Sequence, residues 1–135
     1  MRIFLDANIL FSAAKSDGAI GRLLELLIAA GHECWADGYV AEEARRNLAA
    51  KAPGGLAALE ALLARINVAG VQLAAHPEAA LKLPEKDRPV LAAAMRLGCE
   101  ALMTGDRTHF GAVYGKALGG VTIHSPRSLA EKLLR

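Results

Sequence analysis

The stretch ALMTGDRTHF, residues 101–110, starts with apolar residues and becomes polar after Gly105. A short aliphatic segment that stops at a glycine is typical of a buried strand followed by a turn. Asp106 comes directly after that turn. In sheets built from parallel strands, ligands bind beyond the carboxyl ends of the strands. Whether Asp106 lies at the ligand-binding edge of a parallel sheet therefore depends on the fold of the whole chain.

Outside this stretch, the spacing at which apolar residues recur alternates between that of strands and that of helices. Further strands are predicted at RIFLD, HECWA and VTIHS, and VQLAA is predicted as a brief strand or extended chain. The helices predicted between them include GAIGRLLELLIAAG, the segment from Tyr39 to Lys51, and DRPVLAAAMRLG. Alternating strands and helices imply right-handed crossovers. The expected fold class is therefore α/β, with three α/β/α layers and a mainly parallel central sheet of about five strands.

Composition is consistent with one globular domain over residues 1–135. Hydrophobic residues make up 53% of the chain but aromatic residues only 4%, so a core of small aliphatic side chains is expected. No apolar stretch is long enough to span a bilayer and no signal peptide is recognisable, so a cytoplasmic protein without a membrane partner is expected. Cys34 and Cys99 form no C-x-x-C pair, which favours buried free thiols over a zinc or redox site.

Three aspartates fall at the predicted functional edge. Asp6 directly follows the first strand in IFLDANIL, and Asp106 follows the strand of residues 101–103. Asp87 begins a helix whose apolar stripe lies three, four, seven and eight residues further on, so it continues the buried face of that helix.

A glutamate joins these aspartates by helical phase. In YVAEEARRNL the apolar stripe passes through Val40, Ala44 and Leu48, and Glu43 lies beside it. Glu42 lies three and four residues before two arginines, the spacing of an ion pair on a solvent-facing surface. The inward-facing acid is therefore predicted to be Glu43.

Each acid also has a purely structural explanation. Asp6 and Asp87 are suitable helix caps, Glu43 suits a helix surface, and Asp106 suits a turn. These explanations do not predict that four acids gather at one edge of one small domain. Gathered carboxylates repel one another unless a cation neutralises them. Oxygen ligands alone favour Mg²⁺ or Mn²⁺, which commonly bind substrate phosphate as well.

In their order along the chain, FLDANILFSA, YVAEEARRNL, DRPVLAAAMRLGCEALMTGD and the following HF resemble the motifs of PIN-domain nucleases. That family includes the ribonuclease toxins of bacterial toxin–antitoxin pairs. The resemblance implies that four acids are catalytic and hold Mg²⁺ or Mn²⁺, namely Asp6, Glu43, Asp87 and Asp106. It also implies that Asn8 and Thr104 are supporting polar residues.

The resemblance further implies an endoribonuclease that hydrolyses RNA phosphodiester bonds with metal-activated water. Its expected partners are an RNA substrate, an antitoxin protein if the chain is a toxin, and a second copy of the chain in a homodimer. Thr108 stands where many family members have a further acid. The sequence therefore leaves open whether one or two cations bind.

The charge distribution is compatible with an RNA partner. The net charge is only +2, but apart from the four acids there are 16 Lys and Arg against ten Asp and Glu. Basic residues close to those acids are candidates for phosphate contacts, which position RNA without selecting its sequence. These candidates are Lys15, Lys86, Arg88 and Arg107. His109 is expected to pack or to cap a helix, and no catalytic role is assigned to it.

Other functions remain as alternatives. The main one is a noncatalytic RNA-binding or scaffolding domain on the same fold, which would bind RNA in the presence of a chelator and cut nothing. Phosphatases of the haloacid dehalogenase type resemble D-x-D after the first strand, where this chain has Asn8 as the third residue. Phosphorylated receiver domains need a lysine after the last strand, and Lys116 precedes it.

Overall fold

Six strands form one sheet in the order β3-β2-β1-β4-β6-β5. The computed structural model of the chain describes residues 1–72 and 75–134. Five strands are parallel, and β5 pairs antiparallel with β6. The strands are β1 (Arg2–Leu5), β2 (Glu33–Asp37), β3 (Asn67–Ala69), β4 (Ala101–Met103), β5 (Ala117–Leu118) and β6 (Val121–His124).

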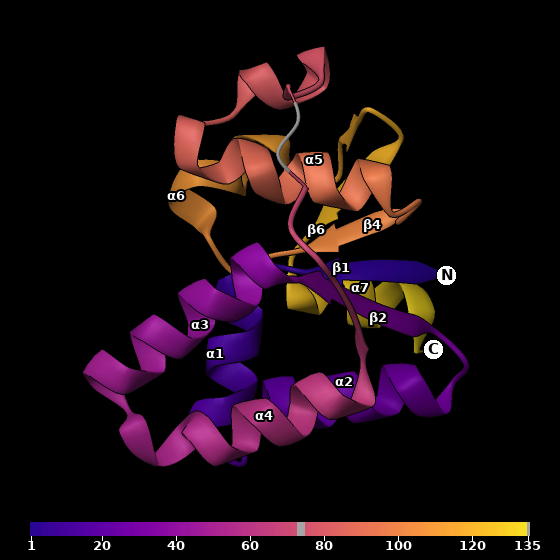
Figure 1. Cartoon of the computed structure of the whole chain (residues 1–135). Coiled ribbons are helices and arrows are strands. Elements are labelled where there is room, and N and C mark those ends of the chain that lie inside the picture. Colours follow the sequence, from indigo (N-terminus) through magenta and orange to yellow (C-terminus); the bar gives the residue numbers. More distant parts are fainter. Residues whose placement is uncertain (73–74, 135) are drawn as a thin grey trace.

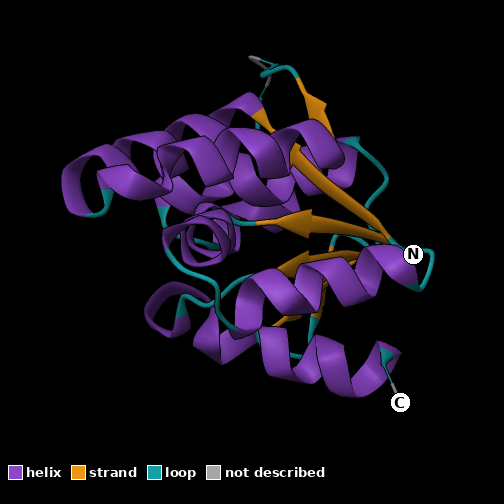
Figure 2. Ribbon diagram, turned by 90° about the horizontal axis from the view of Figure 1, so that it is seen from below, coloured by secondary structure: helices purple, strands orange, loops and turns teal. Residues whose placement is uncertain are grey.

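Helices cover both faces of this sheet (Figures 1 and 2). On one side lie α1 (Ala7–Lys15), α2 (Ala19–Ala29), α3 (Gly38–Lys51), α4 (Leu56–Arg65) and α7 (Pro126–Leu133); on the other lie α5 (Arg88–Arg96) and α6 (Arg107–Phe110). Four 3₁₀ segments connect them: η1 (Pro53–Gly55), η2 (Glu78–Lys82), η3 (Glu85–Asp87) and η4 (Gly111–Val113).

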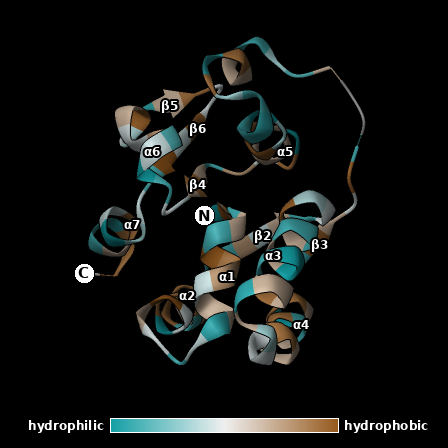
Figure 3. Cartoon of the chain, turned by 90° about the vertical axis from the view of Figure 1, so that its left-hand side faces the viewer, coloured by the Kyte–Doolittle hydropathy of each residue, from teal (hydrophilic) through white to brown (hydrophobic). Residues whose placement is uncertain are grey.

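The centre of the core is β1 together with the helix that follows it. Ile3, Phe4 and Leu5 of β1 are completely buried, as expected for a strand covered by helices on both faces. Helix α1 packs against α2, α3 and α4. Figure 3 shows α1 between α2 on one side and α3 and α4 on the other. The first 15 residues thus supply the middle strand and the middle helix of the larger helical layer.

Four parallel strands pass directly into helices whose first turns are capped by side chains. After β1, β2, β4 and β6, a side-chain oxygen accepts a backbone N–H of the next helix; the caps are Asp6, Asp37, Asp106 and Ser125. Such caps satisfy N–H groups that have no partner inside the helix. All four helices therefore begin at the carboxyl edge of the sheet, which brings distant sequence segments together there.

The predicted α/β class and its mainly parallel sheet are confirmed, with six strands rather than about five. The two-residue strand β5 escaped prediction because it is too short to show a period. VQLAA was expected to be a brief strand or extended chain. Val71 and Gln72 form no regular element, residues 73 and 74 lie outside the described residues, and the strand in this part of the chain lies earlier, at Asn67–Ala69. As an edge strand with exposed Asn67 and Val68, β3 has no apolar alternation.

Two further expectations can be compared with the structure. Cys34 and Cys99 are both buried free thiols, as predicted. Burial raises the pKa of each thiol to about 11, which keeps both protonated at neutral pH. Within residues 1–72 and 75–134, no helix has the length and apolar character needed to cross a bilayer.

The close packing of η1 against α1 generates a stability prediction. A Cβ at Gly55 would lie 2.8 Å from the carbonyl oxygen of Ala14 and 3.0 Å from a methyl group of Leu48, whereas a Cβ at Gly54 would meet nothing within 4 Å. Gly55→Ala should therefore lower the free energy of unfolding by about 1–3 kcal/mol. Gly54→Ala should leave it unchanged or raise it by up to about 1 kcal/mol. Urea unfolding measures both, and equal losses would contradict this packing.

Candidate metal-binding active site

Asp6 is fixed where β1 leaves the sheet next to β4. Leu5 is paired with Met103, and the N–H of Asp6 continues the ladder by donating to the carbonyl oxygen of Met103 at 3.1 Å. The hydroxyl of Thr104 donates to Oδ2 of Asp6 at 2.8 Å, and the N–H of Ala7 donates to Oδ1 at 2.8 Å. Both carboxylate oxygens are thus oriented by neighbours, although the side chain is buried.

Asn8 connects the end of β1 to the turn after β4. Its amide nitrogen donates to Oδ2 of Asp6 and to Oγ1 of Thr104, each at 3.2 Å. Its amide oxygen accepts the N–H of Gly105 at 2.8 Å, and the N–H of Asp106 donates to Oγ1 of Thr104 at 3.1 Å. These contacts hold two acid-bearing segments in one arrangement, and the supporting roles of Asn8 and Thr104 at an active site stay predictions.

Three potential metal ligands converge beside this network. Nδ1 of His109 lies 2.7 Å from Oδ2 of Asp87 and 3.1 Å from Oδ2 of Asp106. One ligand atom from each of the three residues lies within 4.8 Å of the other two. Oδ2 of Asp87 and Nδ1 of His109 are both buried from solvent, and they contact each other. Two carboxylates around one imidazole form a set of ligand atoms that suits a divalent cation.

The position of His109, beside two of the acids, was not predicted from the sequence. Phe110 packs into the core, and the preceding imidazole of His109, which was expected to pack or to cap a helix, lies between two of the acids. The spacing of His109 from Asp106 could have predicted this position, because a residue three positions after a helix-capping aspartate lies next to that aspartate. Thr108, at the position of the absent fifth acid, is exposed.

The predicted difference between the two glutamates of α3 is partly visible in the structure. Glu42 is exposed and pairs with Arg45 at 3.6 Å, and the same arginine also pairs with Glu60 at 2.8 Å. Glu43 is half-buried, and its charge acts on the carboxyl group of Asp6. Glu43 lies outside the close group of three ligand atoms, so its role as a metal ligand stays a prediction.

Burial and mutual repulsion make the acids costly to ionise. Burial raises the pKa of Asp6 to about 6; the hydrogen bonds from Thr104 and Ala7 oppose this shift, and the charges of Glu43 and Asp87 add to it. Burial also raises the pKa of Asp87, against the lowering influence of the neighbouring histidine and lysine. A bound cation would remove this cost, since positive charge favours the ionised form of every carboxylate near it.

Two tyrosines anchor the backbone that carries the acids. The hydroxyl of Tyr39 donates to the carbonyl oxygen of Lys86, directly before Asp87, at 2.8 Å. The hydroxyl of Tyr114 donates to the carbonyl oxygen of Thr104, also at 2.8 Å. The spacing of residues in the sequence does not reveal these contacts, because the two tyrosines lie 47 and ten residues from the carbonyl groups that they contact.

The residues present fit a hard divalent cation. Carboxylate oxygens are the preferred ligands of Mg²⁺ and Mn²⁺, and Mn²⁺ also accepts an imidazole nitrogen. Asp87 and Asp106 with His109 form the close group, and Asp6 is held nearby with its oxygens oriented by donors. Hydrogen bonds of this kind to ligating carboxylates commonly tune metal affinity.

The four basic residues predicted to contact phosphate lie in different surroundings. Lys86 and Arg107 are exposed and adjacent in sequence to Asp87 and Asp106. Arg88 is half-buried and donates to the carbonyl oxygen of Leu83 at 3.0 Å. Lys15 is in the last turn of α1, about 12 Å along the helix from its first residue, at 1.5 Å per residue. All four phosphate contacts stay predictions.

The raised pKa of Asp6 generates a pH prediction for metal-free protein. The folded state holds the proton up to a pH of about 6, whereas the unfolded chain releases it near pH 3.8, the ordinary pKa of an aspartate. Stability from this group is therefore fully present below pH 3.8 and is lost as the pH rises through about 6. Relative to Asp6→Asn, the wild-type free energy of unfolding should fall by roughly 3 kcal/mol across this window.

Urea unfolding in a chelator, repeated at several pH values, measures this difference. The two proteins share every other titratable group, so subtracting the curves isolates Asp6. A difference that stays constant from below pH 4 to above pH 6 would contradict the raised pKa of Asp6.

Comparisons with known proteins identify the fold and the family of the chain. Among curated protein sequences, none matches the chain. One similar structure is a chain of VapBC2 from Rickettsia felis bound to a promoter DNA fragment: the TM-score is 0.64 and the identity 15%, over 93% of this chain and 98% of that chain. Another is DNA-bound VapBC from Salmonella typhimurium, with a TM-score of 0.65 and 15% identity over 93% and 98% of the two chains.

A third similar structure is VapC20 from Mycobacterium tuberculosis, described as a toxin that cleaves the sarcin–ricin loop. Its TM-score is 0.58 and its identity 14%, over 82% of this chain and 93% of that chain. At these identities the similarity shows a shared fold. The family itself is shown by a sequence model of the PIN domain, which matches residues 2–108 and includes all four predicted acids. The chain therefore belongs to the PIN-domain family.

Proposed function

We propose that this protein is a Mg²⁺- or Mn²⁺-dependent endoribonuclease that hydrolyses phosphodiester bonds of RNA. The observation that carries the proposal is the convergence of Asp87, Asp106 and His109 within 4.8 Å, beside the oriented carboxylate of Asp6. Membership of a family whose fold is typical of nucleases supports it. So does the similarity in fold to a toxin described as cleaving the sarcin–ricin loop.

In this proposal Asp6, Glu43, Asp87 and Asp106 hold the cation. When bound, the cation supplies a Lewis acid for the phosphoryl oxygen and lowers the pKa of a water molecule. The chain itself orients the ligands. The side chains of Thr104 and Asn8 donate to Asp6, and the backbone N–H of His109 donates to Oδ1 of Asp106 at 3.1 Å. This leaves the other oxygen of Asp106 facing Asp87 and the imidazole.

Two exposed cations are suited to hold the RNA backbone. Lys86 and Arg107 each precede or follow a site acid by one residue, so a phosphate at the cation site would lie close to both. Contacts of this type fix position and make binding dependent on salt. The imidazole of His109, when protonated, would also place positive charge between Asp87 and Asp106.

We also propose that the protein is the toxin of a toxin–antitoxin pair, a homodimer acting in the cytoplasm. Support comes from fold similarity to chains crystallised as VapBC complexes and as FitAB bound to DNA. A short open reading frame next to the gene, whose product copurifies with this chain and suppresses RNA cleavage, would support the toxin assignment. A chain that cleaves RNA but has no such neighbour would instead be a free nuclease.

Mixed single-stranded RNA should be cut in Mg²⁺ or Mn²⁺ and remain intact in excess chelator. The physical reason is that the crowded carboxylates have no catalytic use without a cation to neutralise them. Gel analysis of labelled RNA measures the cleavage. RNA binding without any cleavage in either metal would favour the noncatalytic RNA-binding domain instead, and full cleavage in chelator would exclude metal dependence.

The two glutamates of α3 provide a matched pair of variants. Glu43→Gln should reduce the cleavage rate by on the order of 100-fold, the effect of losing one strong electrostatic contact in an active site. Glu42→Gln removes only an exposed ion pair with Arg45 and should change the rate by less than about threefold. Initial rates in saturating Mn²⁺ measure both. If Glu42→Gln were the damaging variant, the assignment of Glu43 to the site would be wrong.

A further inference from the structure

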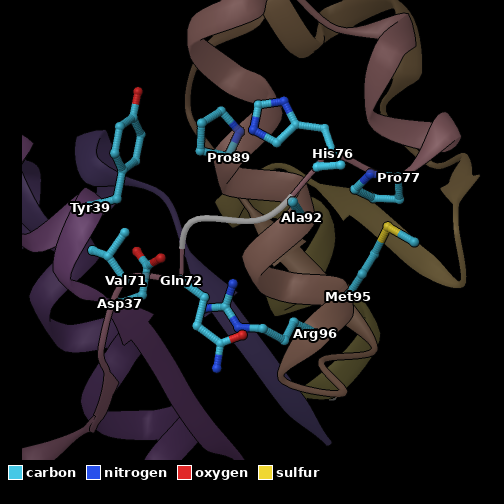
Figure 4. Close-up of a pocket in the computed structure, with 11 residues that line it drawn as sticks. Asp37, Tyr39, Val71, Gln72, His76, Pro77, Pro89, Ala92, Met95 and Arg96 are labelled. Atoms are coloured by element: carbon cyan, nitrogen blue, oxygen red, sulfur yellow. The ribbon is translucent and has the colours of Figure 1, made fainter.

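A pocket of about 340 Å³, the α1 pocket, opens beside the acids at the carboxyl edge of the sheet. Asp106, one of the four predicted acids, lines it, and so does Asn8, which donates to Asp6. By contrast, the described residues around the hollow on the α5 side include none of the four acids (Figure 4). Ligand pockets have volumes of about 300–1,000 Å³. The α1 pocket is therefore large enough for a small ligand group and shares side chains with the candidate site.

Apolar side chains from three helices form part of the wall of the α1 pocket. They are Ile9 of α1, Ile20 in the first turn of α2 and Pro126 in the first turn of α7. Figure 3 shows α2 and α7 on the same side of α1, and these two helices contact each other. Apolar walls with a few polar groups are typical of ligand pockets, and here they suit the carbon skeleton of a sugar.

Two polar side chains of the α1 pocket are held by the acid network. The amide nitrogen of Asn8 donates to Asp6 and Thr104. Oδ1 of Asp106 accepts the N–H of His109, and Oδ2 of the same aspartate faces the imidazole. Reading the edge of a base usually takes a side chain that offers two groups at once. Asn8 and Asp106 are already committed to other contacts, so the pocket is poorly suited to select a base.

Ser12 adds a hydroxyl group to the same wall. It follows Asn8 by four residues on α1, the spacing at which two side chains of a helix are neighbours. A serine hydroxyl can both donate and accept a hydrogen bond. The 2′-hydroxyl of RNA is also both donor and acceptor, and it is the group by which proteins distinguish RNA from DNA. The α1 pocket therefore contains a suitable partner for a ribose.

The acids alone give no reason for a preference for RNA. When water attacks a phosphodiester bond, the 2′-hydroxyl takes no part in the reaction, and DNA contains the same bond. Contacts to phosphate are available to both nucleic acids. A preference for RNA therefore needs a contact to the sugar, close to the phosphate that is cut.

We propose that the α1 pocket binds a ribose directly attached to the scissile phosphate, and that the hydroxyl of Ser12 contacts its 2′-hydroxyl. The inference rests on the proposed function for the placement of that phosphate. Asp106 belongs both to the group of ligand atoms and to the pocket wall, so a phosphate bound at the acids has its sugar beside the pocket. Ser12 is thus a residue that selects RNA over DNA.

Ser12→Ala tests this contact, and Ser16→Ala is its matched control. Alanine removes the hydroxyl and is the residue that helices favour most. Ser16 is four residues further along the chain, at the C-cap of α1, where it is exposed and outside the pocket wall. Neither serine belongs to the acid cluster, so the rise in melting temperature caused by Mn²⁺ should equal that of wild type in both variants.

The first readout is cleavage in Mn²⁺ of an RNA oligonucleotide with one mapped cut site, and of two copies that carry a single 2′-deoxy sugar on either side of the cut. In wild type and Ser16→Ala, one of the two deoxy sugars should lower kcat/KM by about fivefold, the effect of losing one hydrogen bond. Ser12→Ala should lower kcat/KM for the all-RNA substrate by about the same factor. The same deoxy sugar should then have almost no further effect, because both changes remove one contact.

Equal effects of the deoxy sugars in wild type and Ser12→Ala, with wild type cleaving normally, would overturn the contact while leaving the nuclease intact. This comparison separates loss of the contact from a general loss of activity, since a merely damaged variant would keep the wild-type response to the deoxy sugar.

The second readout is binding in Ca²⁺, a hard cation that takes oxygen ligands, of an RNA oligonucleotide and of a 2′-deoxy oligonucleotide with the same bases. Fluorescence anisotropy measures it without any need for cleavage. Ser12→Ala should reduce the preference for RNA by about fivefold relative to wild type and Ser16→Ala. That result supports the pocket even if wild type cuts nothing and the proposed function fails. A preference that is absent from wild type, or unchanged in Ser12→Ala, overturns the pocket, so the two failures are distinguishable.

Discussion

The rest of the structure depends on the accumulation of negative charge at the carboxyl edge of the sheet. Asp6 and Asp87 are buried there, and the charges of Glu43 and Asp87 add to the cost of ionising Asp6. A folded chain tolerates such repulsion only with protons, donors or a cation to offset it. The site has features that correspond to all three. The raised pKa of Asp87 favours a bound proton, hydrogen-bond donors contact Asp6, and a group of side chains fits a divalent ion.

Structural and functional explanations of the acids prove to be compatible rather than exclusive. Asp6 caps a helix, as its structural explanation required, and Asp106, for which that explanation was a turn, also caps a helix. Capping uses one oxygen of Asp106 and directs the other toward Asp87, so the cap itself positions the candidate ligand. Asp87 differs, since its side chain makes no capping hydrogen bond at the start of α5. Its burial at this edge favours the functional explanation.

The sequence predicted features that depend on local periodicity, and it missed those that depend on contacts between distant segments. The helical phase of α3 separated exposed Glu42 from half-buried Glu43. The supporting roles of Asn8 and Thr104 came from the family resemblance and stay predictions, although both side chains take part in the hydrogen bonds around Asp6. The anchoring role of Tyr39 could not be predicted, because its partner is a backbone carbonyl 47 residues away. The position of His109 between two acids was missed because the imidazole was expected to pack or to cap a helix.

Thermal unfolding of wild type and Asp106→Asn, each in chelator and in saturating Mn²⁺, tests the central claim most directly. Asparagine can retain the helix cap while removing one negative charge. In chelator the variant should be as stable as wild type or slightly more stable. In Mn²⁺ the wild type should gain about 2.7 kcal/mol at 100 times the dissociation constant, and Asp106→Asn should lose most of that gain. A variant that keeps the full metal-induced rise in melting temperature would show that Asp106 is not a ligand and would contradict the account.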